Sequence, residues 1–354
     1  MIYPFLDIKR LRLSALCASA LNLSSLKLKL ELTMKMKHMN TRTLVTLLIA
    51  AAFISQPPAS FSQTQTSSPT SRASASARGP DLRRQIELSS RAARGRVGAA
   101  VMLLETGEAF AFNGGARFPM QSVYKLPIGM ALLRRVDEGA LKLDGRVRVE
   151  KSDLVPAELY SPIRDKNPKG GIELSVGELL RAMLVESDGT ASDIILRLDG
   201  GPARVNEFLR ALGVGGVVVA TTEKAMAADR LVQYRNHAAP LAIIKLLRAV
   251  QEGRGLSASS HALLLQLMTE CATGPHRLKG LLPAGTPVAH KTGSSGTAGG
   301  VAAATNDVGI ITLPDGRHLA VAVFVSDSRA DEQTRERVIA EIARAAWDWA
   351  TQTH

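Results

Sequence analysis

The segments that read as β-strands lie at the two ends of the chain, and this order restricts the fold more than any other feature. Near the N-terminal end, apolar runs at 97–104 and 109–113 flank a Thr106-Gly107 turn and predict a hairpin. Strand patterns return only near the C-terminal end, at 288–292, 301–305, 308–313 and 318–325. These patterns predict an α/β fold in which one mixed sheet is assembled from both chain ends, is faced by helices and carries an inserted helical lobe.

The middle of the chain carries helical patterns. Ser175 and Glu178 form a capping box ahead of a helix at 179–186. The stretch 220–239 has no clear period and is expected to be a long ordered loop, which in a compact domain is usually functional. Ser328 is expected to cap the last helix, whose apolar face includes Val338 and Trp347. Other helices are expected at 81–94, 190–198, 205–212, 241–250 and 261–268.

The first 79 residues are expected to lie outside the fold. Residues 34–63 read as a secretory signal, with a basic start, an apolar run and small residues for cleavage. The apolar run is short for a bilayer, so a retained anchor is the less favoured alternative. Residues 1–33 are interpreted as an upstream extension, and 64–79 as a flexible Ser/Thr-rich linker. The catalytic domain is then 80–354, and the protein is expected to be secreted or periplasmic.

Within residues 80–354 the expected sheet part is 80–118 and 286–354, and the expected lobe is 119–285. A cleft between the two is the natural place for a site.

Composition excludes several classes of function. The net charge is +12, but residues 64–354 contain 36 basic and 30 acidic residues, a net +6 without a basic block, which argues against a nucleic-acid partner. Only Cys17 and Cys271 occur, and Cys17 lies in the excluded part, so no disulfide is expected. Cys271 is interpreted as a packed structural thiol rather than a nucleophile. The seven histidines show no ligand spacing, so no metal is expected.

The stretch around Ser122 carries the first candidate for chemistry. Ser122 and Lys125 are three residues apart, so on a helix both side chains lie on one face. Phe118-Pro119 reads as the approach to that helix. Ser122 is thus expected at a helix N-terminus, where unpaired N–H groups favour developing negative charge. A hydroxyl beside an amine in this setting is a candidate nucleophile, although the spacing alone also occurs by chance.

Three further motifs contain residues that could assist such a nucleophile. Ser187-Asp188-Gly189 lies between two expected helices, Glu223 lies in the long loop, and His290-Lys291-Thr292-Gly293 ends a strand. Taken singly, they read as a helix cap, a solvated charge and an edge-strand lysine that discourages aggregation. Their joint occurrence, in this order and on these elements, favours one shared catalytic site.

Together the motifs resemble those of the class A serine β-lactamases. The likeness runs from about Asp81 to the C-terminus, and Glu223 distinguishes class A within the wider penicillin-binding superfamily. Segments at 121–125, 222–236 and 277–283, followed by the Lys-Thr-Gly motif, look closest to the extended-spectrum, PER-like branch. The resemblance implies an antiparallel sheet flanked by helices, an all-helical lobe, a β-lactam substrate, no cofactor and a monomer that is free of the membrane after signal removal.

The resemblance also implies a role for each motif residue. Ser122 would attack the lactam carbonyl, with its proton taken by Lys125 or by Glu223 through a water. Ser187 would pass a proton to the leaving nitrogen, and Glu223 would activate the water that hydrolyses the acyl-enzyme. The N–H groups of Ser122 and Ser294 would form the oxyanion hole. The residues expected to bind substrate are Lys291, Thr292, Ser294 and Arg277 at its carboxylate, together with Tyr160, Gly189 and Gly293.

Three positions depart from the family pattern. Gly189 replaces an Asn that contacts substrate and steadies the lysine, and Ala227 replaces an Asn that helps to hold the deacylating water. Thr221 and Asn236 stand where most members have an Arg–Asp bridge, so a differently folded, wider loop that admits bulky cephalosporins is expected. Glu223 favours a hydrolase. The alternatives left open are a binding protein or sensor that acylates and stalls, and a DD-peptidase or esterase on the same scaffold.

Overall fold

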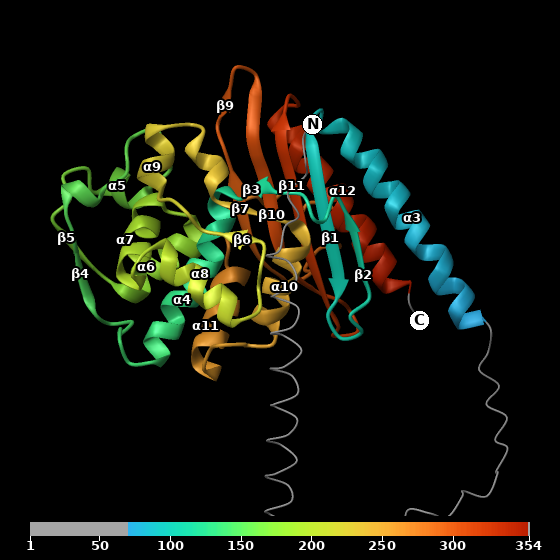
Figure 1. The fold of residues 1–354 in the computed structure, drawn as a ribbon, viewed down its shortest axis with the longest axis horizontal. Coiled ribbons are helices and arrows are strands. Elements are labelled where there is room, and N and C mark those ends of the chain that lie inside the picture. The colour runs from blue at the N-terminus through green and yellow to red at the C-terminus, as the bar shows by residue number, and fades with distance from the viewer. Residues whose placement is uncertain (1–69, 353–354) are drawn as a thin grey trace, which may run out of the picture. The chain divides into compact units, whose positions relative to one another are not determined.

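The centre of the fold is a sheet that joins the two ends of the chain (Figure 1). In the computed structural model, the backbone is described for residues 70–352 and the side chains for residues 81–352. The strand order is β2-β1-β11-β10-β8, with β9 paired to β10, and every pair is antiparallel. The strands are β1 (Arg96–Leu103), β2 (Ala109–Phe112), β8 (Val288–Ser294), β9 (Thr297–Ala298), β10 (Val301–Thr312) and β11 (His318–Ser328).

The expected sheet from both chain ends is therefore confirmed, and two details are wrong. The sheet is antiparallel, as the family resemblance implied. It is not the mixed sheet that the order of the strand patterns predicted. The two strands expected at 301–305 and 308–313 are one strand, β10. Asn306 and Asp307 interrupt the apolar pattern, but both are fully buried and hydrogen-bonded, Asp307 to His290 of β8 and Asn306 to the Pro119 carbonyl, so they do not end the strand.

Alternate residues of the central strand β11 face two different cores. Residues from Leu319 to Val325, taken in steps of two, pack in the core under α3 (Thr70–Ala92) and α12 (Glu332–Thr351). Residues from Ala320 to Phe324 pack in the core shared with the lobe. This is the two-residue period of a strand that is buried on both faces. The sheet thus lies between the paired helices α3 and α12 on one side and α10 (Pro240–Gln251) with the lobe on the other (Figure 1).

The helices next to the sheet correct two expectations. The linker expected at 64–79 is helical from Thr70 onward, because α3 begins there; alanine and arginine in this segment are strong helix formers. Asp331, not Ser328, caps α12, since its side chain accepts a hydrogen bond of 2.7 Å from the Thr334 backbone N–H. Ser328 is instead buried in β11 and donates to the Ala93 carbonyl. The expected extension at 1–33 and signal at 34–63 lie outside the described residues.

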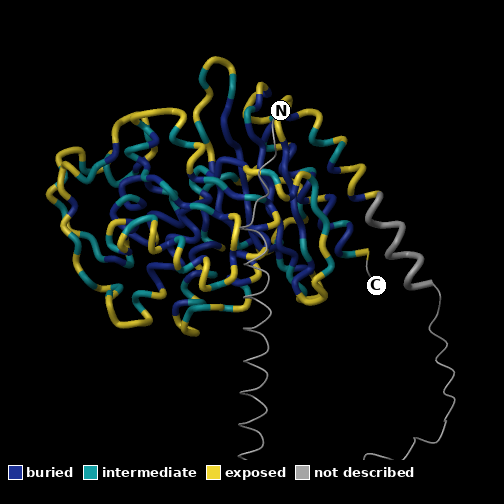
Figure 2. Tube along the Cα trace, viewed as in Figure 1, coloured by how far each residue is buried: buried dark blue, intermediate teal, exposed yellow. Residues whose placement is uncertain are grey.

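The lobe packs around α4, the helix that begins at Lys125, and its buried residues form one core with the inner face of the sheet (Figure 2). The Ser175–Glu178 capping box is confirmed. The α-helices of the lobe are α4 (Lys125–Asp137), α5 (Pro162–Lys166), α6 (Val176–Arg181), α7 (Gly189–Asp199), α8 (Pro202–Ala211), α9 (Glu223–Ala228) and α11 (Ala258–Thr269). Shorter turns are η1 (Gln121–Tyr124), η2 (Lys151–Asp153), η4 (Val232–Arg235) and the π-turn η3 (Ala182–Glu186).

Two small sheets complete the lobe. They are β4 (Arg146–Val149) with β5 (Ile172–Ser175), and β3 (Phe118–Pro119) with β7 (His237–Ala238) and β6 (Val217–Val218).

The stretch 220–239, expected to be a loop, contains α9, η4 and β7. Its two ends are joined by the buried side chain of Asn236. The Asn236 carbonyl oxygen accepts from the N–H groups of Ala220 and Thr221 at 2.7 and 3.0 Å, and its amide donates to the Thr221 carbonyl at 3.1 Å. These bonds close the segment where most family members are expected to have an ion pair. In the described part of the chain, no helix is both long and apolar enough to cross a bilayer.

Candidate active site

Ser122 lies in the η1 turn, which runs directly into α4. The nucleophile candidate is therefore in the helical approach to α4 rather than in its first α-helical turn. The turn is held from two sides. The side-chain amide of Asn306 donates to the carbonyls of Pro119 and Met120 at 2.8 and 3.0 Å, and the Met120 N–H donates to the Asn236 carbonyl at 2.9 Å.

Gly293 allows strand β8 to lie directly against this turn. A Cβ at position 293 would be 2.3 Å from the Met120 carbonyl oxygen and 3.1 Å from the Val123 nitrogen. The backbone on both sides is fixed, so a side chain there would push the Ser122 turn and the Lys-Thr-Gly strand apart. Gly293 is thus required for close approach rather than for a turn conformation.

We expect Gly293→Ala to lower kcat/KM about 100-fold, because a displacement of about 1 Å at a reacting group costs this much. The matched control is Gly296→Ala. Gly296 lines the same cleft, but a Cβ there would meet nothing within 4 Å. Steady-state kinetics of both variants, with circular dichroism to check folding, measure the difference. Equal losses in the two variants would show that the close contact at Gly293 is unimportant.

Lys125 is buried and connects two parts of the lobe. Its Nζ donates to the Ser187 carbonyl at 2.7 Å and lies 2.9 Å from Glu223 Oε1, with Ser187 Oγ at 3.5 Å. Both partners of the ion pair are nearly inaccessible to solvent. A buried charge needs such a partner, because unpaired burial is costly. The pair therefore holds the Glu223 carboxylate against the amine that follows Ser122 by one turn.

Ser187 stands between two ammonium groups. Its Oγ accepts from Lys291 Nζ at 3.0 Å and lies 3.5 Å from Lys125 Nζ. The residue follows the π-turn η3 and has left-handed backbone angles, φ 64° and ψ 29°, a strained conformation that is frequent at functional sites. Since both lysines can only donate, the Ser187 hydroxyl proton is free to point at another acceptor in the cleft.

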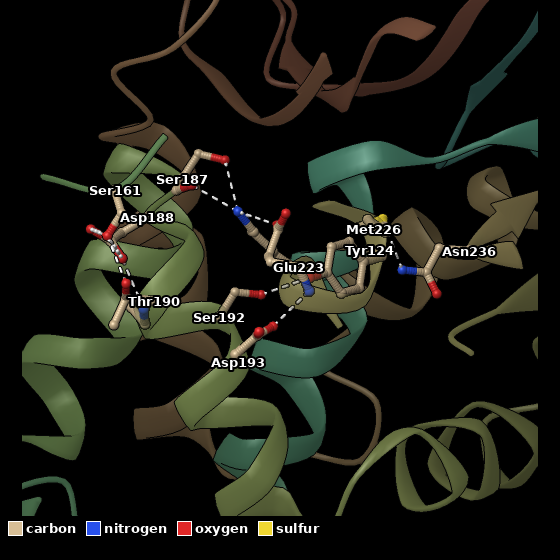
Figure 3. Close-up of polar contacts among 12 residues, drawn as sticks. Tyr124, Ser161, Ser187, Asp188, Thr190, Ser192, Asp193, Glu223, Met226 and Asn236 are labelled. Atoms are coloured by element: carbon tan, nitrogen blue, oxygen red, sulfur yellow. Dashed lines mark hydrogen bonds and ion pairs between the residues drawn. The ribbon is translucent and has the colours of Figure 1, made fainter. Parts of the chain in front are cut away.

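Asp188 anchors the segment that carries Ser187 (Figure 3). It is fully buried and caps α7, accepting from the Ala191 N–H at 2.8 Å. It also accepts from the Ser161 hydroxyl at 3.0 Å and from the Ile163 N–H at 2.8 Å. Both readings of this motif are correct in part: Asp188 is a helix cap, and the cap fixes its neighbour in the site.

Glu223 is the first residue of α9, and Thr222 caps this helix. Asp193 on α7 holds the helix start from below, since its carboxylate accepts from the N–H groups of Glu223 and Lys224 at 2.7 and 3.1 Å (Figure 3). Burial raises the pKa of Asp193 to about 6, although these N–H donors oppose the shift. Asp193 was missed at the sequence level; its position six residues after Ser187 carries no signal without the fold.

Lys291 is fully buried at the cleft end of β8 and donates to Ser187 Oγ and, at 3.3 Å, to the Thr292 carbonyl. Burial lowers its pKa to about 8; the nearby Lys125 charge adds to this, while Cys271, Asp307 and Glu223 oppose it. Near neutral pH, the protonation of Lys291 therefore depends on the charges of its neighbours.

The guanidinium of Arg277 makes its hydrogen bonds and its ion pair with other residues of the chain. It donates to Ser294 Oγ at 2.7 Å and to the Asn306 carbonyl at 3.1 Å, and pairs with Glu336 at 3.0 Å. The bond to Ser294 uses the hydroxyl oxygen as acceptor and leaves its proton for another group. Arg277 thus fixes the direction of the Ser294 hydroxyl.

The backbone N–H of Ser294 points away from its neighbouring strand. In β8, which is an edge strand, the next residue Ser295 donates to the Ala304 carbonyl of β10 at 2.9 Å. Because successive N–H groups of a strand alternate in direction, the Ser294 N–H faces the free edge, on the side of the Ser122 turn. An N–H group that faces the Ser122 turn in this way is available as a donor to a developing oxyanion.

The cleft at this edge has a volume of about 520 Å³ and opens beside Tyr160, whose side chain is 62% exposed. Gly189 is buried, donates its N–H to the Tyr160 carbonyl at 3.1 Å, and offers no polar side chain. A Cβ there would lie 3.1 Å from that carbonyl. The candidate residues brought together along the cleft are Ser122, Lys125, Tyr160, Ser187, Glu223, Arg277, Thr292, Gly293 and Ser294. Among the described residues, no three His, Cys, Asp or Glu side chains are grouped to hold a metal.

Residues 81–350 match the family model described as the Beta-lactamase enzyme family. The chain is 41% identical over 274 residues to extended-spectrum β-lactamase PER-1 of Pseudomonas aeruginosa, covering 77% of this chain and 89% of the relative. It is 38% identical to β-lactamase VEB-1 of the same organism, covering 76% and 90%.

Solved structures agree. A β-lactamase from Chitinophaga pinensis has a TM-score of 0.74 and 46% identity, covering 76% of this chain and 99% of that one. The TLA-1 extended-spectrum β-lactamase has a TM-score of 0.74 and 42% identity, covering 77% and 99%. The cleft geometry, the antiparallel sheet with its helical lobe and these likenesses agree: the chain belongs to the Beta-lactamase enzyme family, in its class A branch.

Proposed function

We propose that the protein is an exported, monomeric β-lactamase that opens the ring of penicillins and cephalosporins through an acyl-enzyme on Ser122. The observation that carries the proposal is the position of Lys125, whose ammonium contacts both Glu223 and Ser187. This contact places a candidate base, a candidate proton carrier and the nucleophile turn in one cleft, as triad-type catalysis requires.

Acylation begins with attack of Ser122 Oγ on the lactam carbonyl. Lys125, or Glu223 through a water, takes the proton. The tetrahedral oxyanion is held by the N–H groups of Ser122 and Ser294; losing one such donor typically costs ~100- to 1000-fold in rate. Ser187 then donates its hydroxyl proton to the leaving nitrogen, and the two ammonium groups that it faces make it a better acid.

The substrate carboxylate binds at the end of β8. Lys291 supplies positive charge, and Thr292 and Ser294 supply hydroxyl donors. Arg277 acts there through Ser294, whose oxygen it occupies. Gly293 permits the approach of this strand, Tyr160 lines the mouth of the cleft, and Gly189 holds the Tyr160 carbonyl from behind. Because Gly189 has no side chain, the substrate side chain gains no amide contact at this position.

Deacylation depends on Glu223, which activates the water that hydrolyses the ester. This step separates a turning-over hydrolase from a binding protein or sensor that stays acylated, and from a DD-peptidase or esterase. Gly189 and Ala227 keep the stalled binding protein as the second candidate, because both replace amides expected to support turnover. The 220–239 segment, closed by Asn236 instead of an ion pair, is proposed to admit bulky oxyimino-cephalosporins.

The proposal is tested by mixing the purified protein with a chromogenic cephalosporin and following colour and protein mass together. Sustained colour development with a transient adduct is expected. A single burst equal to the enzyme concentration, with a persistent adduct, would support the stalled binding protein instead. Parallel assays with an oxyimino-cephalosporin test the proposed breadth of the cleft, which fails if only narrow-spectrum substrates are hydrolysed.

A further inference from the structure

A row of buried polar side chains lies behind the Lys-Thr-Gly strand, and the steps above do not use it. Cys271 follows α11, His290 lies on β8 and Asp307 lies on β10; all three are buried. Thr273 and Thr292 continue the row to the cleft, which both of them line. The row therefore connects the interior of the sheet to the place where the substrate carboxylate is proposed to bind.

The row consists of two hydrogen-bonded groups. His290 Nδ1 lies 3.0 Å from each oxygen of Asp307. The other ring nitrogen, Nε2, is buried and has no hydrogen-bond partner among the described residues, and the thiol of Cys271 is near enough to the ring to raise its pKa. Cys271 Sγ lies 3.4 Å from Thr273 Oγ1, which lies 2.5 Å from Thr292 Oγ1.

The surroundings of Cys271 and His290 favour the charged form of each. Burial alone would lower the pKa of His290, but the charge and hydrogen bond of Asp307 outweigh it and raise the pKa to about 9. Burial would likewise raise the pKa of Cys271, but the imidazole and the Lys291 charge outweigh it and lower the pKa to about 6. The two shifts act in the same direction, because each favours a thiolate beside an imidazolium.

Counting protons shows what this charge does to the two hydroxyls. A thiolate can only accept a hydrogen bond, so the Thr273 hydroxyl donates to it. The oxygen of Thr273 must then accept from Thr292, whose single proton points inward, away from the cleft. A neutral thiol is a weak acceptor, so Thr273 can donate to Thr292 instead. Only in that state is the Thr292 proton free to bind a carboxylate.

We propose that the Cys271–His290 pair positions the Thr292 hydroxyl, so that the cleft binds the substrate carboxylate more tightly when Cys271 is protonated. This inference rests on the proposed function, because it takes the bound anion to be a β-lactam carboxylate. Cys271 and His290 act as positioning residues through Thr273, without touching the substrate. By linkage, a bound carboxylate favours the thiol by the same factor.

The charged groups around the pair come from several elements. They are His290 and Lys291 on β8, Asp307 on β10, Lys125 on α4 and Glu223 on α9. The thiolate also supports the charge of Lys291. Removing it should therefore move the loss of the Lys291 proton to lower pH, which is a second effect with its own position on the pH axis.

The first test compares the pH dependence of KM in the parent and in Cys271→Ser, whose hydroxyl does not ionise in this range. The thiolate is lost as the pH falls through about 6. We therefore expect the parent KM to fall about tenfold between pH 8 and pH 5, as one hydrogen bond to a charged group contributes. The serine variant should show no step near pH 6, and its KM should rise only where Lys291 loses its proton, at a lower pH than in the parent. Asp193 also titrates near pH 6 but is present in both chains. Equal profiles would overturn the proposal.

Thr273→Val is the second variant, because it removes the connecting hydroxyl and keeps the thiol and the volume of the side chain. We expect it to flatten the acid limb of the KM profile while Cys271 still titrates. The change should appear in KM rather than in kcat. A variant that keeps the parent's acid limb would show that the thiolate acts without the hydroxyl row, and the proposal would fail.

The titration of Cys271 can be read without turnover. The ultraviolet absorbance of the full-length parent minus that of Cys271→Ser isolates this thiolate and cancels Cys17. A step centred near pH 6 is expected, and a carboxylate-bearing β-lactam added to the Ser122→Ala background should move it to higher pH. No step, or a step that the ligand does not move, overturns the inference. If the parent does not hydrolyse β-lactams, but the absorbance step of Cys271 is present and moves with the ligand, the result counts against the proposed function alone.

Discussion

Ser122→Ala is expected to abolish both the hydrolysis of a chromogenic cephalosporin and the covalent adduct. The alanine removes the one hydroxyl of the η1 turn that lines the cleft, and no other side chain of this turn that lines the cleft can form the ester. Since catalytic groups that act as a unit lose nearly all activity when the nucleophile is removed, kcat should fall by about 10⁴-fold or more. Steady-state kinetics and intact-protein mass spectrometry measure the two effects.

Ser295→Ala is the matched control, because Ser295 lines the same cleft but uses its hydroxyl to hold the Ala304 N–H at 3.0 Å. It should keep an adduct and most of the turnover. If Ser122→Ala still acquires the mass of the drug, another nucleophile is at work and the assignment of Ser122 is wrong.

Glu223→Gln is expected to separate the two halves of the reaction. Glutamine has the same size and can keep a contact with Lys125, but it cannot take a proton from water. Acylation should stay measurable, and release should slow by about 10³-fold, the usual contribution of a general base. The mass spectrum should then show a long-lived adduct after a single burst of colour.

Glu158→Gln provides the control, because Glu158 is an exposed carboxylate that lines the same cleft. Its release rate should match that of the parent. Thermal unfolding of both variants checks whether Lys125, left without its charged partner, destabilises the fold. If Glu223→Gln releases product as fast as the parent, the role proposed for Glu223 is refuted.

The sequence predicted the sheet and most helices because these elements follow simple periods. The strands 97–104 and 318–325 read as continuous apolar runs, and the Ser175–Glu178 box marks a helix start. The errors occur where tertiary contacts override the local pattern. Asn306 and Asp307 read as a strand break, yet they continue β10 because Pro119, Met120 and His290 satisfy them.

The motif residues were found because they are short, distinctive and ordered along the chain. Their supports were not, because each depends on a contact across the fold. Asp193 holds the start of α9 from a different helix. Asn306 fixes the turn that contains Ser122, although it lies 186 to 187 residues later in the sequence than the two carbonyls that it binds. Cys271 was interpreted as a packed thiol; nothing in its sequence neighbourhood indicates that the folded sheet places it beside His290.

The pairing of β1 with β11 has a consequence for how the protein is made. Arg96 pairs with Ser326, and β11 lies between β1 and β10 in the middle of the sheet. A growing polypeptide that has not reached this strand cannot complete its central sheet, so the pairs of β11 with β1 and β10 form only after nearly all of the sheet's residues have been synthesised. Such long-range pairing slows folding. A delay of this kind keeps the chain open during synthesis, the condition in which an unfolded polypeptide is handed to a translocation channel.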